Sequence, residues 1–178
     1  MPSYIALLRG VNVGGNTLRM ERLRALCEEL GLKDVRTYVQ SGNVVFSAGR
    51  SAAHWARAIA QVLEGEARLP VSVIVRSSAD MARIIASNPF LNEKGIDTKR
   101  LHVTFLEKTP AKSAIKALDT LPSGTDRFVH VGEEVYVYCP NGYGNTKLSN
   151  TAFEKALAVR ATTRNWNTVN KLCEMAKT

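Results

Sequence analysis

The stretch VRTYVQSGNVVF (residues 35–46) decides the fold. Val35–Gln40 and Val44–Phe46 are short runs rich in β-branched and aromatic residues, which are typical of strands. Ser41-Gly42-Asn43 lies between them and has the composition of a tight turn. The stretch therefore predicts a β-hairpin.

The hairpin lies in the middle of a series of predicted strands and helices. Tyr4–Leu8 is an apolar run that predicts a strand, and it is followed by a glycine-rich loop, Gly10–Asn16. One amphipathic helix is predicted from about Met20, a second opens at Ser51, and Val71–Val75 predicts a fourth strand. This order of strand, helix, strand, strand, helix and strand is the split βαβ unit of ferredoxin-like folds. The predicted class is α+β.

The second half of the chain repeats part of this order. After a helix over residues 78–87, the predicted elements are a strand at Leu101–Phe105, a helix at Pro110–Leu118, strands at Phe128–Val131 and Val135–Tyr138, and a helix from Thr151. Thr151 and Glu154 have capping-box spacing. A C-terminal helix, about residues 165–177, takes the place of the last strand. We therefore expect one compact domain over residues 1–178, partly duplicated, with halves at about 1–76 and 101–160.

The strands of the second half also predict two unlike sheet faces. Alternation along each strand separates an aliphatic face from one that carries rings and polar atoms, namely His102, Thr104, Phe128, His130, Tyr136 and Tyr138. We expect the aromatic face to pack against the first half or a second subunit. Stacking of nucleic-acid bases on it is the alternative.

Composition favours a folded protein with no membrane span. Of the 178 residues, 45% are hydrophobic and 22% are charged, and the net charge of +8 is concentrated toward the two ends of the chain. Lys and Arg form no cluster that would mark a nucleic-acid stripe. Cys27, Cys139 and Cys173 are far apart, which predicts reduced, buried thiols and neither a disulfide framework nor a zinc site. With no basic leader or long apolar segment, the expected location is cytoplasmic.

Topology predicts where a binding surface would form. The first two strands of a split βαβ unit are parallel, so the Gly10–Asn16 loop should lie beside the hairpin tip. The loop could hold an anion through backbone N–H groups, although it has neither P-loop nor dinucleotide-binding spacing, and a simple tight connection is the alternative. We expect the following residues to converge on this polar rim: Arg9, Asn12, Gly14, Gly15, Asn16, Tyr38, Gln40, Ser41 and Asn43.

Two later segments are candidates to complete the rim. Asn141–Lys147 is rich in glycine and precedes a helix, so Lys147 could neutralise a phosphate and the segment could close as a lid. An ordinary surface loop is the alternative. Arg164, Asn165 and Asn167 surround a tryptophan at a helix start, where backbone donors are free. Helix capping accounts for one asparagine, and we hypothesise that Arg164 and Asn167 reach the rim.

Several motifs together resemble a known family. They are RGVNVGGN (residues 9–16), TYVQSGNVVF (37–46), NPF (88–90), TKLSN (146–150) and RNWNTV (164–169). Together they are similar to the uncharacterised bacterial family catalogued as domain of unknown function 1697, over nearly the whole chain. The resemblance implies a bacterial cytosolic protein with a fold related to a ferredoxin-like duplication. It brings no substrate, cofactor or catalytic residue.

The leading hypothesis is a binding protein for a phosphate-bearing ligand, either a nucleotide, a nucleic acid or a phosphorylated small molecule. The ligand would be held by Arg9, Asn12, the Gly14-Gly15 backbone, Asn43, Lys147 and Arg164. One alternative is a small enzyme at the same rim, with Lys147, Arg164 or Tyr38 as electrostatic or acid-base groups. Another is a dimerising module that uses the aromatic face. No metal or covalent cofactor is indicated, and catalytic residues and oligomeric state stay open.

Overall fold

The computed structural model describes residues 1–15 and 17–177 and divides into two compact units. The first unit contains residues 1–83 together with the C-terminal residues from Lys171 on, and the second contains Ile84–Asn170. The predicted halves, 1–76 and 101–160, each fall inside one unit. That the two units make up one domain stays a prediction. Among the described helices, none has the length and apolar character to cross a membrane.

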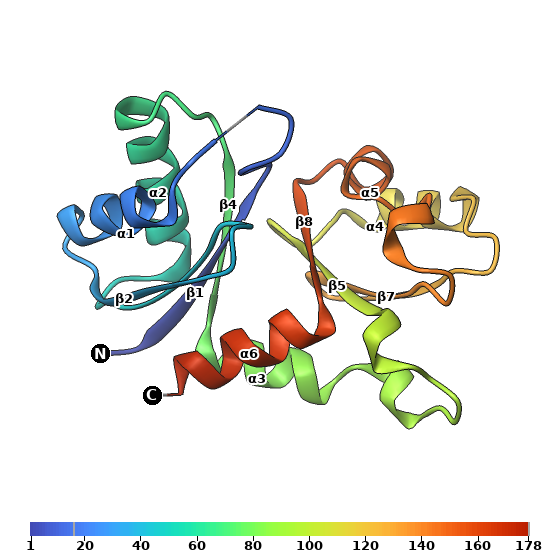
Figure 1. Cartoon of the computed structure of the whole chain (residues 1–178). Helices are drawn as coiled ribbons and strands as arrows, with labels where there is room; N and C mark the ends of the chain where they lie inside the picture. Colours follow the sequence, from blue (N-terminus) through green and yellow to red (C-terminus); the bar gives the residue numbers. More distant parts are fainter. Residues whose placement is uncertain (16, 178) are drawn as a thin grey trace. The chain divides into compact units, whose positions relative to one another are not determined.

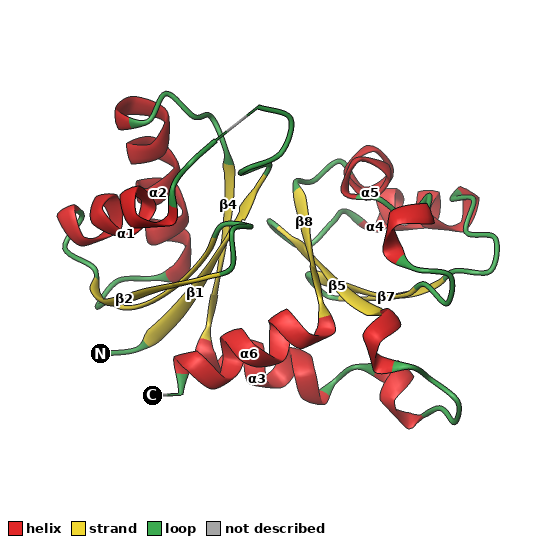
Figure 2. Ribbon diagram, viewed as in Figure 1, coloured by secondary structure: helices red, strands yellow, loops and turns green. Residues whose placement is uncertain are grey.

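The first unit is a four-stranded antiparallel sheet with helices on one face (Figures 1 and 2). Its elements are β1 (Ser3–Arg9), α1 (Met20–Glu29), β2 (Lys33–Tyr38), β3 (Asn43–Ser47), α2 (Ala52–Glu66) and β4 (Ser72–Ser77). The strand order is β2-β3-β1-β4. Since β1 and β2 both pair antiparallel with β3, they run parallel to each other. The predicted order of these six elements is confirmed.

Apolar periodicity explains how the two helices cover the sheet. Helix α1 buries Leu23, Leu26 and Cys27, and the chain leaves it through Gly31 at a φ of +87°. Helix α2 begins after Ser51, whose hydroxyl oxygen accepts a hydrogen bond from the backbone N–H of His54 at 3.3 Å. Its buried residues pack with those of α1 and with one face of the sheet to form a single core. Tyr4, Ala6, Leu8 and Phe46 supply the sheet side of this core.

The second unit repeats the arrangement of the first. Helix α3 (Ser78–Ala86) leads from the first unit into the second, where a 3-10 turn at Pro89–Asn92 precedes β5 (Leu101–Leu106), α4 (Lys112–Ile115), β6 (Arg127–Val131), β7 (Glu134–Tyr138), α5 (Asn150–Leu157) and β8 (Ala161–Asn165). Helix α6 (Trp166–Ala176) begins in the second unit and belongs to the first from Lys171 on. Further 3-10 turns lie at Thr98–Arg100, Lys116–Thr120 and Tyr143–Asn145. The strand order, β6-β7-β5-β8, corresponds to that of the first unit, and its pairs are again antiparallel.

The prediction that a helix replaces the last strand of the second half is wrong, because that strand is present as β8. Residues Ala161–Asn165 pair with β5 along five positions, and Arg164 lies opposite Val103. Only after this strand does the predicted C-terminal helix, α6, begin. The sequence of β8, ATTRN, contains one aliphatic residue, so no apolar alternation marks it as a strand. Threonine has a high strand propensity, and pairing with a buried central strand decides its conformation.

The structure also corrects the predicted start of α5. The helix begins at Asn150, and its cap is Ser149, whose hydroxyl oxygen accepts a hydrogen bond from the Ala152 N–H at 3.2 Å. The predicted capping box of Thr151 and Glu154 is therefore wrong. A Glu154 carboxylate oxygen instead accepts a hydrogen bond from the backbone N–H of Ala161 at 2.9 Å, which ties the helix to the first residue of β8.

The predicted aromatic face of the second sheet is wrong. Pairing places Tyr136 opposite Val103 and Tyr138 opposite Leu101, so the tyrosines share a face with these aliphatic residues. His102 lies opposite Val137 and belongs to the other face. Alternation within a strand separates its two faces, but only the pairing register shows which faces of neighbouring strands coincide. The Tyr136 hydroxyl donates to the carbonyl oxygen of Ile84 at 2.7 Å, so this ring is a buried core residue.

The three cysteines are free and buried, as predicted. Burial, and to a lesser extent the neighbouring Glu28 carboxylate, raises the pKa of the Cys27 thiol to about 12. Because the thiolate is the reactive form, we expect Cys27 to resist a thiol reagent at pH 8 in the folded protein. Denaturant should release all three thiols to the reagent. Rapid modification of Cys27 in native protein, mapped by mass spectrometry, would contradict this.

Candidate functional site

The glycine-rich loop after β1 lies against the β2–β3 hairpin, as the parallel strands predict. The side-chain amide of Asn12 donates to the carbonyl oxygen of Gln40 at 2.6 Å, and the Leu8 N–H donates to the carbonyl oxygen of Gly42 at 2.9 Å. These two hydrogen bonds join segments about thirty residues apart in the sequence. The expected juxtaposition of loop and hairpin tip is confirmed.

Two of the predicted ligand residues in this rim hold the loops together. Asn12 adopts a φ of +58°, and its side chain also accepts from the Leu18 N–H at 2.8 Å and donates to the Leu18 carbonyl oxygen at 3.1 Å. The fully buried Asn43 side chain donates to the Tyr38 carbonyl oxygen at 3.0 Å and to the Ser41 hydroxyl oxygen at 2.9 Å. Both amides are thus engaged in shaping the rim itself.

The other predicted residues of the first unit differ in accessibility. Gly14 and Gly15 are exposed and have φ of +61° and +92°, a backbone shape suited to glycine. Gln40 and Ser41 are exposed at the hairpin tip, whereas Arg9 and Tyr38 are half-buried. Asn16 lies outside the described residues. The rim therefore offers the exposed backbone of a glycine turn and a few polar side chains.

In the second unit, the predicted residues Arg164, Asn165 and Asn167 divide into one buried and two exposed side chains. Arg164 is 8% exposed, and its guanidinium donates to the Thr162 hydroxyl at 2.8 Å and to the Thr163 carbonyl oxygen at 2.9 Å. Burial lowers the pKa of Arg164 to about 10, so the group stays charged at neutral pH. Asn165 caps α6, because its side-chain oxygen accepts from the Thr168 N–H at 2.8 Å.

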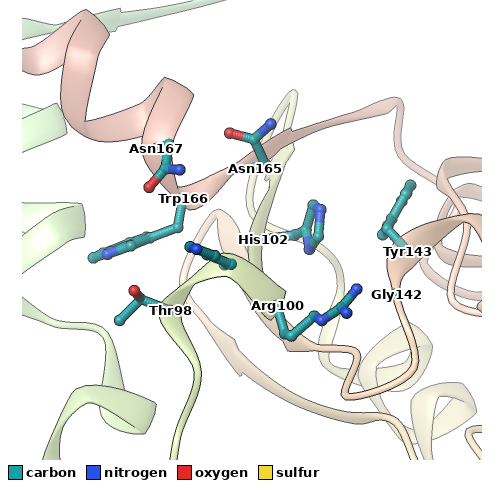
Figure 3. A pocket seen from close by; sticks show the side chains of 9 residues that line it. Thr98, Arg100, His102, Gly142, Tyr143, Asn165, Trp166 and Asn167 are labelled. Carbon is teal, nitrogen blue, oxygen red and sulfur yellow. The ribbon is translucent and has the colours of Figure 1, made fainter.

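The two exposed asparagines line a cavity of about 190 Å³ at the start of α6 (Figure 3), which we name the α6 cavity. Its lining comes from the 3-10 turn before β5, from β5 itself, from the glycine-rich segment after β7 and from the first residues of α6. The lining residues are Thr98, Lys99, Arg100, His102, Gly142, Tyr143, Asn165, Trp166 and Asn167.

Strand pairing brings these segments together. β5 is the inner strand between β7 and β8, and the register places His102 opposite Asn165. On the other side of β5, the Cys139 N–H donates to the Arg100 carbonyl oxygen at 3.0 Å, and the Gly142 N–H donates to the Cys139 carbonyl oxygen at 2.9 Å. The start of β5 is thus flanked by the end of β8 and by the segment that leaves β7.

One wall of the α6 cavity is a stacked pair of rings. The His102 and Tyr143 ring centroids are 4.5 Å apart, with 27° between the ring planes. Gly142 lies beside Arg100 at the edge of the cavity. Its φ is +91°, and a Cβ atom at this position would lie 3.1 Å from Nη1 of Arg100. The guanidinium of Arg100 therefore rests close over the backbone of Gly142 at the edge of the cavity.

Burial lowers the pKa of His102 below its usual value, and a hydrogen bond to the Arg100 backbone partly opposes this shift. We expect His102 to titrate below pH 6.5 in the folded protein and near 6.5 when unfolded. The folded state then binds fewer protons in this window, so stability falls as the pH falls below 6.5. An NMR titration of the His102 ring should show this low midpoint.

A variant of His102 tests the predicted effect of pH on stability. Replacing His102 by asparagine should flatten the dependence of the unfolding free energy on pH below about 6.5. A midpoint for His102 above 6.5 would contradict the assignment.

Lys147 lines a different cavity of about 210 Å³. This second cavity lies between the Pro122–Asp126 loop and the glycine-rich segment, and it shares only Gly142 with the α6 cavity among the residues that line both. The segment itself is closed by backbone hydrogen bonds, among them Thr146 N–H to the Tyr143 carbonyl oxygen at 3.1 Å. Lys147 and the two asparagines therefore face different spaces.

The chain matches the model of a known protein family. The family model described as "Protein of unknown function (DUF1697)" matches residues 1–136. The chain belongs to the DUF1697 family. The resemblance expected from the sequence motifs is thereby confirmed, and the TKLSN and RNWNTV motifs lie beyond the matched residues.

A solved structure supports the fold of this DUF1697 chain. It is the conserved bacterial protein SP0830 from Streptococcus pneumoniae, which matches with a TM-score of 0.81 and 22% identity over 100% of this chain and 99% of the other. At this identity the likeness concerns the mixed α/β fold alone. No curated protein matches the sequence.

The predicted site residues of this DUF1697 chain belong to two units. Arg9, Asn12, Gly14, Gly15 and the hairpin residues are in the first unit, and Lys147, Arg164, Asn165 and Asn167 are in the second. The meeting of the first-unit residues with those of the second stays a prediction, whereas Lys147 lines a different cavity from Asn165 and Asn167. Sequence reasoning missed Lys99, Arg100 and His102 as site residues, although a basic pair directly before a predicted strand was the available signal. Within residues 1–15 and 17–177, no three His, Cys, Asp or Glu side chains gather as a metal site.

Proposed function

We propose that this protein binds a phosphate-bearing ligand in the α6 cavity. The observation that carries the proposal is the lining of that cavity: Lys99 and Arg100 are exposed there, and none of the described lining residues is acidic. Charge-assisted hydrogen bonds from Arg and Lys to phosphate oxygens are about twice as strong as neutral ones. The composition of the lining thus favours an anion.

The start of α6 adds to this preference. Asn165, Trp166 and Asn167 are the cap and the first two residues of an eleven-residue helix, and all three line the cavity. The first backbone N–H groups of a helix lack intrahelical acceptors and carry a partial positive charge. A phosphate in the cavity would therefore meet side-chain cations and helix donors together.

The rings in the lining support a nucleotide or a nucleic acid as the ligand. Tyr143, His102 and Trp166 contribute aromatic surface beside the cationic groups. Aromatic rings bind bases by stacking, with little dependence on base identity. The described lining is rich in hydrogen-bond donors and has no carboxylate, which favours the binding of an anion.

We also infer that each unit is a ferredoxin-like split βαβ fold. The support is the order of six elements in each unit and the matching strand orders β2-β3-β1-β4 and β6-β7-β5-β8. With β8 in place, the duplication includes all six elements of both halves. The α6 cavity then lies where the fourth strand of the second repeat passes into its following helix.

A thermal-shift experiment with matched variants tests the binding proposal. Nucleoside monophosphates should raise the melting temperature, because a ligand that prefers the folded state stabilises it, and the corresponding nucleosides should not. Arg100→Gln should weaken binding by roughly 10- to 100-fold, the loss expected for hydrogen bonds to a charged group. Lys147→Gln removes the same charge from the neighbouring cavity and should bind nearly as the wild type does.

Two results would contradict the proposal. One is that no phosphate-bearing compound or oligonucleotide stabilises the wild-type protein at low salt. The other is that Lys147→Gln abolishes binding while Arg100→Gln has no effect, since this would place the ligand in the second cavity.

A further inference from the structure

We infer, on the basis of the proposed function, that the α6 cavity takes a terminal phosphomonoester and discriminates against an internal phosphodiester. The first support is size. Its volume of about 190 Å³ is below the roughly 300–1,000 Å³ of pockets that enclose a whole small-molecule ligand. A compact charged end of a ligand fits this space, and the remainder of the ligand stays outside.

Charge matching is the second support. A phosphomonoester carries a charge of about −1.5 to −2 at pH 7 and has three acceptor oxygens. An internal phosphodiester carries a single negative charge. The α6 cavity presents two cations, Lys99 and Arg100. Two cations in one small space match a dianion better than a monoanion.

The third support is the place of Arg100 in the lining. Its guanidinium rests over Gly142, where a side chain would begin 3.1 Å from Nη1, and its carbonyl oxygen accepts from the Cys139 N–H. Opposite it in the lining are Asn165 and Asn167 at the start of α6 (Figure 3). Donors from two sides of the cavity could therefore contact the three oxygens of one terminal phosphate.

Trp166 provides a local reporter for the experiment. The chain has two tryptophans. Trp166 lines the α6 cavity, and Trp55 lies in the core of the first unit. In a ¹⁵N-labelled full-length protein, a ligand in the cavity should move the indole N–H signal of Trp166 and leave that of Trp55 in place.

Methyl phosphate and dimethyl phosphate are the decisive pair of probes at pH 7.5. They differ in one methyl group and therefore in charge, and neither has a base that could stack. We expect methyl phosphate to shift the Trp166 signal with at least about tenfold higher affinity than dimethyl phosphate. Arg100→Gln should abolish this difference, and Lys147→Gln should retain it.

A second set of probes separates the sources of the phosphate. A nucleoside 5′-monophosphate represents a small molecule, and a 5′-phosphorylated oligonucleotide represents a nucleic-acid end. Each is compared with its 5′-hydroxyl counterpart. Loss of affinity on removal of the terminal phosphate supports the inference for either probe. The phosphorylated probe that binds more tightly identifies the source of the phosphate.

These experiments distinguish failure of the terminal-phosphate inference from failure of the proposed function. Equal affinity for methyl and dimethyl phosphate, or for phosphorylated and hydroxyl-ended oligonucleotides, overturns the preference for a terminal phosphate and leaves the proposed function standing. If no phosphate compound moves the Trp166 signal at millimolar concentration, the proposed function itself fails.

Discussion

Replacing Gly42 by alanine is expected to destabilise the protein by about 2–4 kcal/mol. Gly42 lies at the tip of the β2–β3 hairpin with a φ of +75°, in the region that side chains other than glycine rarely adopt. A methyl group there would begin 2.8 Å from Cβ of Leu8 and 3.4 Å from Cβ of Val11. Both neighbouring atoms are close to the backbone, so they cannot move aside without shifting β1 and the glycine-rich loop.

The matched control is Gly49→Ala. Gly49 follows β3 on the same hairpin, has no positive φ, and has open space where its side chain would be. We expect this variant to stay within about 0.5 kcal/mol of the wild type. Chemical denaturation of both variants gives the comparison. Similar stabilities for the two would show that the hairpin tip tolerates a side chain and that the close packing against β1 is not required.

Replacing Arg164 by alanine is the second change with a large expected effect. Arg164 is buried, and its guanidinium donates to Thr162 and Thr163 within its own strand. Truncation removes the guanidinium donor to both oxygens and a long packed side chain from β8. We expect a loss of about 2–4 kcal/mol of unfolding free energy.

The structure thus favours a loss of stability at a position that the sequence placed among the predicted ligand residues. Arg57→Ala is the control, because Arg57 is an exposed arginine on α2 and its removal should cost no more than about 0.5 kcal/mol. An Arg164→Ala variant with wild-type stability and no ligand binding would instead make Arg164 a ligand residue.

The fold of the first unit was predictable because local signals agree there. Apolar runs mark β1 and β4, turn residues separate β2 from β3, and periodic apolar faces mark α1 and α2. In the second unit, β8 was missed because its polar and threonine-rich sequence becomes a strand only by pairing with β5. The two faces of that sheet were misassigned for a related reason, since register between strands is a tertiary property.

The candidate site was only partly predictable. Asn165 and Asn167 were identified from their position at a helix start, but their neighbours in the α6 cavity were not. His102 comes beside Asn165 through the pairing of β5 with β8, so the missed strand also concealed this contact. Arg100 reaches Gly142 through the end of β7, again by sheet pairing. Residues about 40 and 65 positions apart meet here without any local sequence motif.

The central claim is that the α6 cavity holds a phosphate. A crystal structure of the full-length protein grown with methyl phosphate tests it most directly. The predicted result is phosphate density within hydrogen-bonding distance of the Arg100 guanidinium and the first backbone N–H groups of α6. Density only at the Gly10–Gly15 loop or beside Lys147, with the α6 cavity free of phosphate, would show that the α6 cavity is not the phosphate site.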